Sequence, residues 1–186
     1  MTTHARFIGM ALLGVGLGAG SMGCSKSPAG SSTPTDADFS VCSGTPAVRF
    51  TPGMSVTSAS GAYNVSIESA LTVLDDGSTI PIAAIGNDTF SVSVTMAPAG
   101  GADAGATAAS GGDAPADLNM TSTSLPWMPV HMHGASNLPT VTAQSGGFSV
   151  AGIDFFMGGY WQLPLNLVPA GGTADTALFS ICIPDD

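Results

Sequence analysis

The chain is poor in basic residues. Its 186 residues include only three Lys and Arg together, against 13 Asp and Glu, which gives a formal net charge of -10. A nucleic-acid-binding surface needs Lys and Arg to neutralise phosphates, and charge-driven attraction to anionic lipid also needs a basic patch. The composition therefore excludes nucleic acid as an expected partner. The acids are scattered and form no Asp-x-Asp-x-Asp-Gly calcium loop.

Motifs of the common enzyme classes are missing as well. The sequence contains no Gly-x-Ser-x-Gly elbow, no phosphate-binding glycine loop and no His-Glu-x-x-His pair. Glu68 is the only glutamate, so a paired-carboxylate mechanism would depend on scattered aspartates. A hydrolase that uses Asp154 with His131 stays open on the sequence alone, but we expect no enzyme.

The first 23 residues have the layout of a bacterial signal peptide. His4 and Arg6 precede an apolar run, Phe7 to Ala19, that is too short to span a membrane. Ser21-Met22-Gly23-Cys24 then resembles a lipobox, which predicts a lipid on Cys24 and a flexible linker over 24–38. Ser25 after the cysteine favours the outer membrane, facing the periplasm. The alternative is an ordinary signal peptide that leaves Cys24 as a free thiol.

Lipidation of Cys24 would leave two of the three cysteines, Cys42 and Cys182. The envelope is oxidising, and a bond between them would close a loop of roughly 140 residues, which the chain-entropy model values at about 4 to 5 kcal/mol. The sequence therefore predicts a Cys42–Cys182 disulfide. Cys182 as a copper ligand is the competing interpretation, but its position in the apolar run 177–183 favours the disulfide.

Several segments alternate between apolar and polar residues with period two, as strands with one buried face do. The clearest are Tyr63 to Ile67, Phe90 to Met96 and Trp161 to Leu167. Frequent turn signals and the lack of an amphipathic helix predict one antiparallel β-sandwich over 39–186, with an immunoglobulin-like topology. Pro164 predicts an edge strand or a bulge. The stretch 97–116, rich in Gly and Ala, predicts a low-complexity loop.

Two segments gather imidazole and thioether groups. Trp127 to Gly134 holds two of the three histidines, and Phe155 to Trp161 adds a methionine and aromatic residues. If the first segment is extended, His131 and His133 share a face and can hold one ion. Imidazole and thioether suit copper, Cu(I) in particular, whereas zinc usually takes a thiolate or a third imidazole. The predicted ligands are His131, His133, Met128, Met132 and Met157.

The same segments resemble the signature of the YtkA-like domain, a family of small bacterial envelope proteins. The residues that carry the resemblance are Met128-Pro129, His131 and His133 with Gly134, and Phe156-Met157-Gly158 with Trp161. An upstream stretch, Ile80-Pro81 to Val92, is similar to the start of the family's first long strand. The resemblance covers roughly the last hundred residues. The chain departs from the family pattern in the insertion at 97–116 and in Met132, where glycine is common.

This resemblance also implies an immunoglobulin-like sandwich. Some YtkA-like and FixH-like proteins are associated with cytochrome oxidase assembly, so it implies copper handling beside an envelope metalloprotein or oxidase-assembly partner. A second interpretation needs no metal: Met, Phe and Trp pack in the core, and the histidines fix a structural turn. The protein is then a tethered module that binds a protein or another ligand through edge strands or loops.

Overall fold

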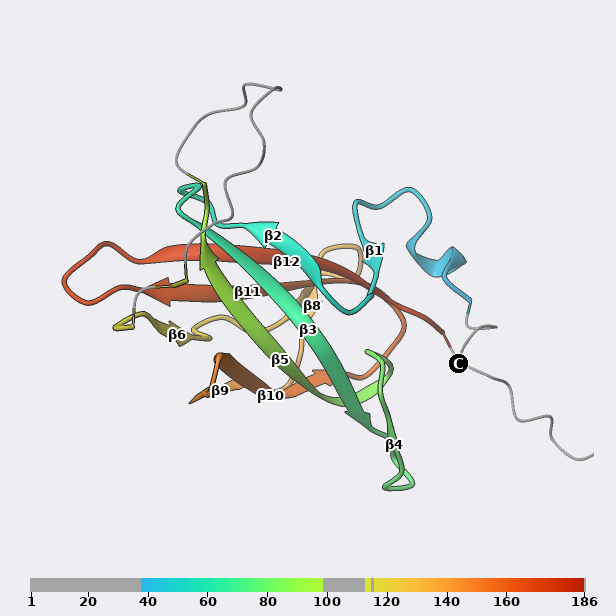
Figure 1. Ribbon diagram of the computed structural model, residues 1–186. Coiled ribbons are helices and arrows are strands. Elements are labelled where there is room, and N and C mark those ends of the chain that lie inside the picture. Colours follow the sequence, from blue (N-terminus) through green and yellow to red (C-terminus); the bar gives the residue numbers. More distant parts are fainter. Residues whose placement is uncertain (1–37, 99–112, 115, 186) are drawn as a thin grey trace, which may run out of the picture. The chain divides into compact units, whose positions relative to one another are not determined.

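The protein is a β-sandwich (Figure 1). The computed structural model describes residues 38–98, 113–114 and 116–185, in which the one helix is a short 3-10 turn, η2 (Ser40–Cys42). The all-β sandwich expected from the sequence is confirmed, and its immunoglobulin-like character stays a prediction. No helix within these residues is long and apolar enough to cross a membrane. The predicted signal peptide, Cys24, most of the linker and most of the 97–116 loop lie outside the described residues.

The first sheet, sheet I, has six strands in the order β2-β3-β5-β10-β9, with β4 paired to β3. Its neighbouring strands are antiparallel, and bulges interrupt β3 after Ile67 and β10 after Ala151. Its strands are β2 (Met54–Thr57), β3 (Tyr63–Val73), β4 (Thr79–Ile80), β5 (Gly86–Met96), β9 (Thr140–Gln144) and β10 (Gly147–Phe155).

The second sheet, sheet II, also has six strands, in the order β1-β12-β11-β7-β8, with β6 paired to β11. All its pairs are antiparallel except that of β1 with β12, which is parallel. Its strands are β1 (Val48–Arg49), β6 (Asn119–Thr121), β7 (Trp127–Met128), β8 (His133–Gly134), β11 (Gly159–Val168) and β12 (Asp175–Ile183).

The alternation in the sequence decides which face of each sheet is buried. In β5 every second side chain points inward, while hydroxyl-bearing residues between them face out. The same pattern holds in β11, where Trp161, Leu163 and Leu165 are fully buried. Inward side chains from both sheets form one core, whose burial is the main stabilising term. Its largest members are Trp161, Phe90, Phe155, Phe179, Ile67, Met120 and Met128.

Pro164 does not lie on an edge strand, and that prediction is wrong. β11 pairs with β12 along its length, and Pro164 stands opposite Leu178 without a shift of register. On the other side of β11, β7 pairs at Gln162 and β6 pairs from Asn166 to Val168. Pro164 therefore lies in the gap between β7 and β6, where a proline breaks no ladder hydrogen bond.

The structure joins Cys42 and Cys182 as a disulfide, with a Cα–Cα distance of 6.0 Å and a sequence separation of 140. Both cysteines are buried, so this bond fastens η2 to the last strand. Cys182 is consequently not free to act as a copper ligand. A chain that begins at Ser25 retains all the residues that the structure describes.

Asp175, at the start of β12, ties the two sheets together. Its carboxylate accepts hydrogen bonds from the hydroxyl and the backbone N–H of Ser60, in the turn between β2 and β3, the latter at 3.0 Å. The backbone N–H of Thr176 also donates to it, at 2.8 Å. Burial raises the pKa of Asp175, but hydrogen bonds from Ser58, Ser60 and Thr176 outweigh burial, so the net pKa is lowered.

Candidate metal centre

The two histidines lie on the β7–β8 hairpin, with His131 in its turn and His133 at the start of β8. β7 and β8 pair antiparallel, with Met128 opposite His133. The N–H of Met132 donates to the carbonyl of Met128 at 2.8 Å, which closes a turn over the residues between them. Met132 has a φ of 57° and is the one non-glycine residue with positive φ in the described part of the chain. The expectation of an extended segment is therefore wrong.

The turn nevertheless brings the two imidazoles together. The ring centroids of His131 and His133 lie 5.8 Å apart, with an angle of 31° between the rings. His131 is exposed, whereas His133 is half-buried. The Nδ1 atom of His133 is buried and has no hydrogen-bond partner. Buried polar atoms without a partner are rare because their desolvation is uncompensated.

Aromatic side chains close one side of this pair. The ring of Phe156 stacks on His133 with centroids 5.2 Å apart, and Trp161 meets His133 edge-on at 6.5 Å. The indole N–H of Trp161 donates to the carbonyl of Met157 at 3.0 Å, which fixes the indole orientation. The imidazole of His133 therefore sits against an apolar wall.

The three methionines in the predicted ligand set have different surroundings. Met132 is 79% exposed beside the imidazoles. Met157 is half-buried and packs against the core. Met128 is 0% exposed, and its Cε would overlap a Cβ at Gly159. Met128 thus has a core position, so it is not included in the ligand set proposed below.

Other classes of metal ligand do not gather in the described residues. Nowhere in 38–98, 113–114 and 116–185 do three or more His, Cys, Asp or Glu side chains form a group that could hold an ion. Asp154, which the sequence left open as a partner of His131, accepts a hydrogen bond from the Ser136 hydroxyl at 2.7 Å. A metal site at this turn must therefore use two imidazoles and a thioether.

A buried carboxyl group, Asp88, was missed in the sequence. It is 0% exposed at the start of β5, and one of its oxygens, Oδ2, has no hydrogen-bond partner. Burial raises its pKa to about 8, although a hydrogen bond with Thr72 opposes this shift. The period-two alternation could have revealed Asp88, because Asp88 lies two residues before Phe90 and so shares the inward face of Phe90 and Val92.

The Thr72 hydroxyl lies between Asp88 and a backbone carbonyl. Its Oγ1 lies 2.7 Å from Oδ1 of Asp88 and 2.5 Å from the carbonyl oxygen of Ile82, so both oxygens compete for it as a donor. A hydroxyl has one hydrogen to donate, so Thr72 cannot fully satisfy both oxygens at once. The hydrogen bond from Thr72 therefore offsets little of the effect of burial on Asp88, which agrees with the raised pKa.

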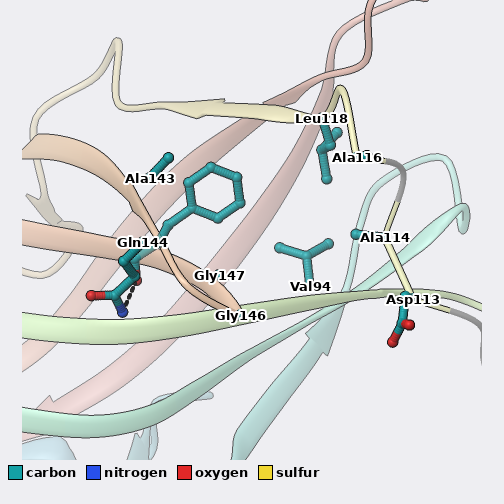
Figure 2. A pocket seen from close by; sticks show the side chains of 10 residues that line it. Val94, Asp113, Ala114, Ala116, Leu118, Ala143, Gln144, Gly146 and Gly147 are labelled. Carbon is teal, nitrogen blue, oxygen red and sulfur yellow. Dashed lines mark hydrogen bonds between the residues drawn. The ribbon is translucent and has the colours of Figure 1, made fainter.

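A cavity of about 350 Å³ opens at the other end of β10, near its first residues. Figure 2 shows Gln144 and Asp113 at opposite ends of this hollow, with Val94 and Leu118 between them. The amide of Gln144 already donates to the carbonyl of Phe148 and to the hydroxyl of Ser91. The cavity has a mixed polar and apolar lining and contains none of the predicted site residues.

No protein-family model, no curated protein and no solved structure matches the chain. The resemblance to the YtkA-like domain therefore remains a prediction from the residues that carry it.

Proposed function

We propose that the protein binds copper at the β7–β8 turn through His131, His133 and Met132. The observation that carries this proposal is the buried Nδ1 atom of His133, which has no partner among the residues that the structure describes. A metal ion bound to this nitrogen would remove the cost of its desolvation. The imidazole of His131 lies close to that of His133. It could therefore supply the next ligand of a two-coordinate or three-coordinate ion.

The separation of the two rings supports the proposal. An ion held about 2 Å from a nitrogen of each imidazole places the ring centroids roughly 5 to 6 Å apart. The observed distance is 5.8 Å. The exposed His131 is the ring that can adjust, because Phe156 and Trp161 hold His133 in place.

The donor types favour copper over other metals. Two imidazoles with a thioether suit Cu(I), whereas calcium and magnesium prefer oxygen ligands. The left-handed backbone at Met132 is unfavourable for a residue with a side chain, by about 1 kcal/mol. Such positions cluster at functional sites. Its exposed thioether next to the imidazoles accounts for a methionine in this conformation.

The cellular setting forms part of the same proposal. A lipid on Cys24 would hold the domain at the bacterial outer membrane, facing the periplasm. Copper held there would serve delivery to, or protection of, an envelope metalloprotein such as an oxidase during assembly. The likeness to the YtkA-like signature supports this role.

The strand order supports the proposed immunoglobulin-like topology. In that fold, strands A-B-E-D form one sheet and C-F-G form the other. Here β3-β5-β10-β9 correspond in order to A-B-E-D, and β11 with β12 correspond to F and G. The segment that contains β6, β7 and β8 takes the place of C.

The test is a competition titration of the chain from Ser25 onward with Cu(I) and Cu(II). We expect one ion per chain in the parent protein, and no binding above background when His131→Ala is combined with His133→Phe. Phenylalanine at 133 keeps the packing against Phe156 and Trp161, so the variant should remain folded. Val130→Ala, in the same turn, is the matched control and should bind as the parent does.

Unfolding curves for the three proteins separate the two functional classes. Loss of copper from a folded double variant supports the metal site. Equal binding by the parent and the double variant would overturn it. General destabilisation of the double variant, with no binding by the parent, would favour the structural turn of a metal-free interaction module.

A further inference from the structure

An exposed apolar surface surrounds the two imidazoles. Within the described residues, twelve large hydrophobic side chains are exposed, and five of them stand on or beside the β7–β8 hairpin. Val130 is 62% exposed and Met132 79%, the two highest values among the twelve. We call this surface the apolar rim; its members are Leu125, Trp127, Val130, Met132 and Phe156.

The members of the rim lie on both faces of the β7–β8 hairpin and in its turn. A Cβ at Gly134 would lie 3.4 Å from the Cβ of Leu125 and 3.5 Å from the Cε3 atom of Trp127, so both side chains cover that strand residue. Phe156 reaches the hairpin through its contact with His133. Exposed apolar patches mark sites of contact with proteins or membranes.

Four of the five rim residues lie in a stretch of sequence without charged residues. The chain contains 13 acids, yet residues 118–153 include no Asp, Glu, Lys or Arg. Burial of these four residues therefore desolvates no ionised side chain of their own stretch, whereas Phe156 lies two residues from Asp154. Because this stretch also lacks Lys and Arg, it offers no electrostatic attraction to anionic lipid headgroups.

The described chain begins beside the rim. The N–H of Asp185 donates to the carbonyl of Asp38 at 3.3 Å. The side chain of Asp185 packs so closely on Gly158 that a Cβ there would overlap its carboxylate, and Gly158 is two residues from Phe156. The residues that precede Asp38 therefore join the domain at the end that carries the rim.

We propose that the apolar rim docks onto a neutral phospholipid surface. The inference rests on the lipid-anchor part of the proposed function: the 14 residues from Ser25 to Asp38 span at most about 50 Å, so the anchor keeps the rim near the bilayer. Tryptophan at a water–lipid boundary is a favoured arrangement, and Trp127 is 40% exposed at the rim. Docking adds a second membrane contact to a single lipidated residue.

Vesicles of phosphatidylcholine test the docking without the anchor. The chain from Ser25 onward is mixed with vesicles at millimolar lipid and separated by flotation, in the absence of copper. We expect the protein to float with the vesicles and its tryptophan emission to move to shorter wavelength. The emission shift should vanish in Trp127→Phe, because Trp161 is already fully buried.

A matched pair of variants locates the contact. Val130→Asp should reduce the vesicle-bound fraction by about tenfold or more, because it places a charge in the rim. Leu178→Asp changes an exposed leucine on β12, outside the rim, and should bind as the parent does. Absence of flotation, or equal loss in both variants, would overturn the proposal. So would a dimer in sedimentation equilibrium that Val130→Asp disperses, since the rim would then bind a second copy.

Two further measurements keep this proposal separate from the proposed function. Mass spectrometry of the full chain extracted from cells tests the lipid on Cys24 directly. The copper titration described above tests the metal site. If either measurement gives a negative result, the vesicle experiment still tests the docking proposal independently.

Discussion

Two buried polar atoms lack a partner in the described residues, and their surroundings differ: Oδ2 of Asp88 in sheet I and Nδ1 of His133 in sheet II. Asp88 is enclosed between strands, and the hydroxyl of Thr72 donates to its other oxygen, Oδ1, at 2.7 Å. His133 sits at a surface turn, beside a second imidazole and an exposed thioether. The carboxyl group can be neutralised by a proton, whereas in the proposed function a metal ion would bind the imidazole nitrogen.

The comparison shows that an unpaired buried atom does not by itself identify a binding site. A carboxyl group removes its charge by keeping a proton, as the raised pKa of Asp88 indicates. The imidazole nitrogen of His133 faces no acceptor or donor among the described residues. Neighbouring donor groups decide between the two outcomes, and only the histidine has them.

The largest expected effect comes from removing the disulfide. The Cys42→Ala and Cys182→Ala double variant should lose about 5 kcal/mol of unfolding free energy. Cys182 pairs with Tyr160, next to Trp161, so the imidazole site should lose copper affinity as well. Asp88 in sheet I should keep its pH dependence. Urea unfolding at several pH values checks both statements, and a changed pH dependence would show that the two sites are coupled.

The next largest effect concerns Asp88. Its pKa of about 8 lies above the unfolded value of 3.8, so the native state holds a proton that the unfolded chain releases. The stabilisation is complete below pH 3.8 and is lost as the pH rises to about 8. Asp88→Asn, which mimics the protonated acid, should stabilise the protein by about 4 kcal/mol at pH 7 and by little at pH 4. An Asn variant that is less stable at neutral pH would contradict a protonated Asp88.

Asp175 provides the opposite case, a carboxylate whose hydrogen bonds favour the charged form. Its pKa is lowered, so the stabilisation is present above the unfolded value and is lost as the pH falls through the folded pKa. Asp175→Asn should cost about 2 kcal/mol at neutral pH. The difference from the parent should shrink in acid, where both proteins carry a neutral group. A pH-independent loss would mean that shape, and not charge, holds the Ser60 turn.

The smallest effect is expected at Met132. Glycine adopts positive φ without strain, so Met132→Gly should raise the unfolding free energy by about 1 kcal/mol. It also removes the thioether, which should weaken Cu(I) binding more than Cu(II) binding. Thermal unfolding and the two copper titrations test this together. Unchanged Cu(I) affinity would remove Met132 from the ligand set.

Period-two alternation was sufficient to predict the strands of the core. The segments 63–67, 90–96 and 161–167 lie in β3, β5 and β11 as the pattern indicated. The disulfide also followed from the sequence, because only two cysteines stood within the folded region. Both inferences depend on local patterns or on counting, which tertiary structure rarely overrides.

The geometry of the turn could not be predicted in the same way. The left-handed backbone at Met132 is rare for a residue with a side chain, and nothing in its neighbours signals it. Met128 also looked like a ligand beside His131 and His133. In the structure Met128 lies on β7, which pairs with β8, and its side chain is buried in the core. The period-two pattern does place residue 88 on the inward face, but an aspartate is polar and so did not suggest a buried position.

The most direct test of the copper site observes the nitrogen itself. Imidazole ¹⁵N shifts of His133 should be recorded by NMR before and after one equivalent of Cu(I), which is diamagnetic. We predict that Nδ1 carries no proton in the free protein and that its shift changes to that of a metal-bound nitrogen. A protonated Nδ1, or a shift that stays unchanged with Cu(I), would contradict the proposed metal site.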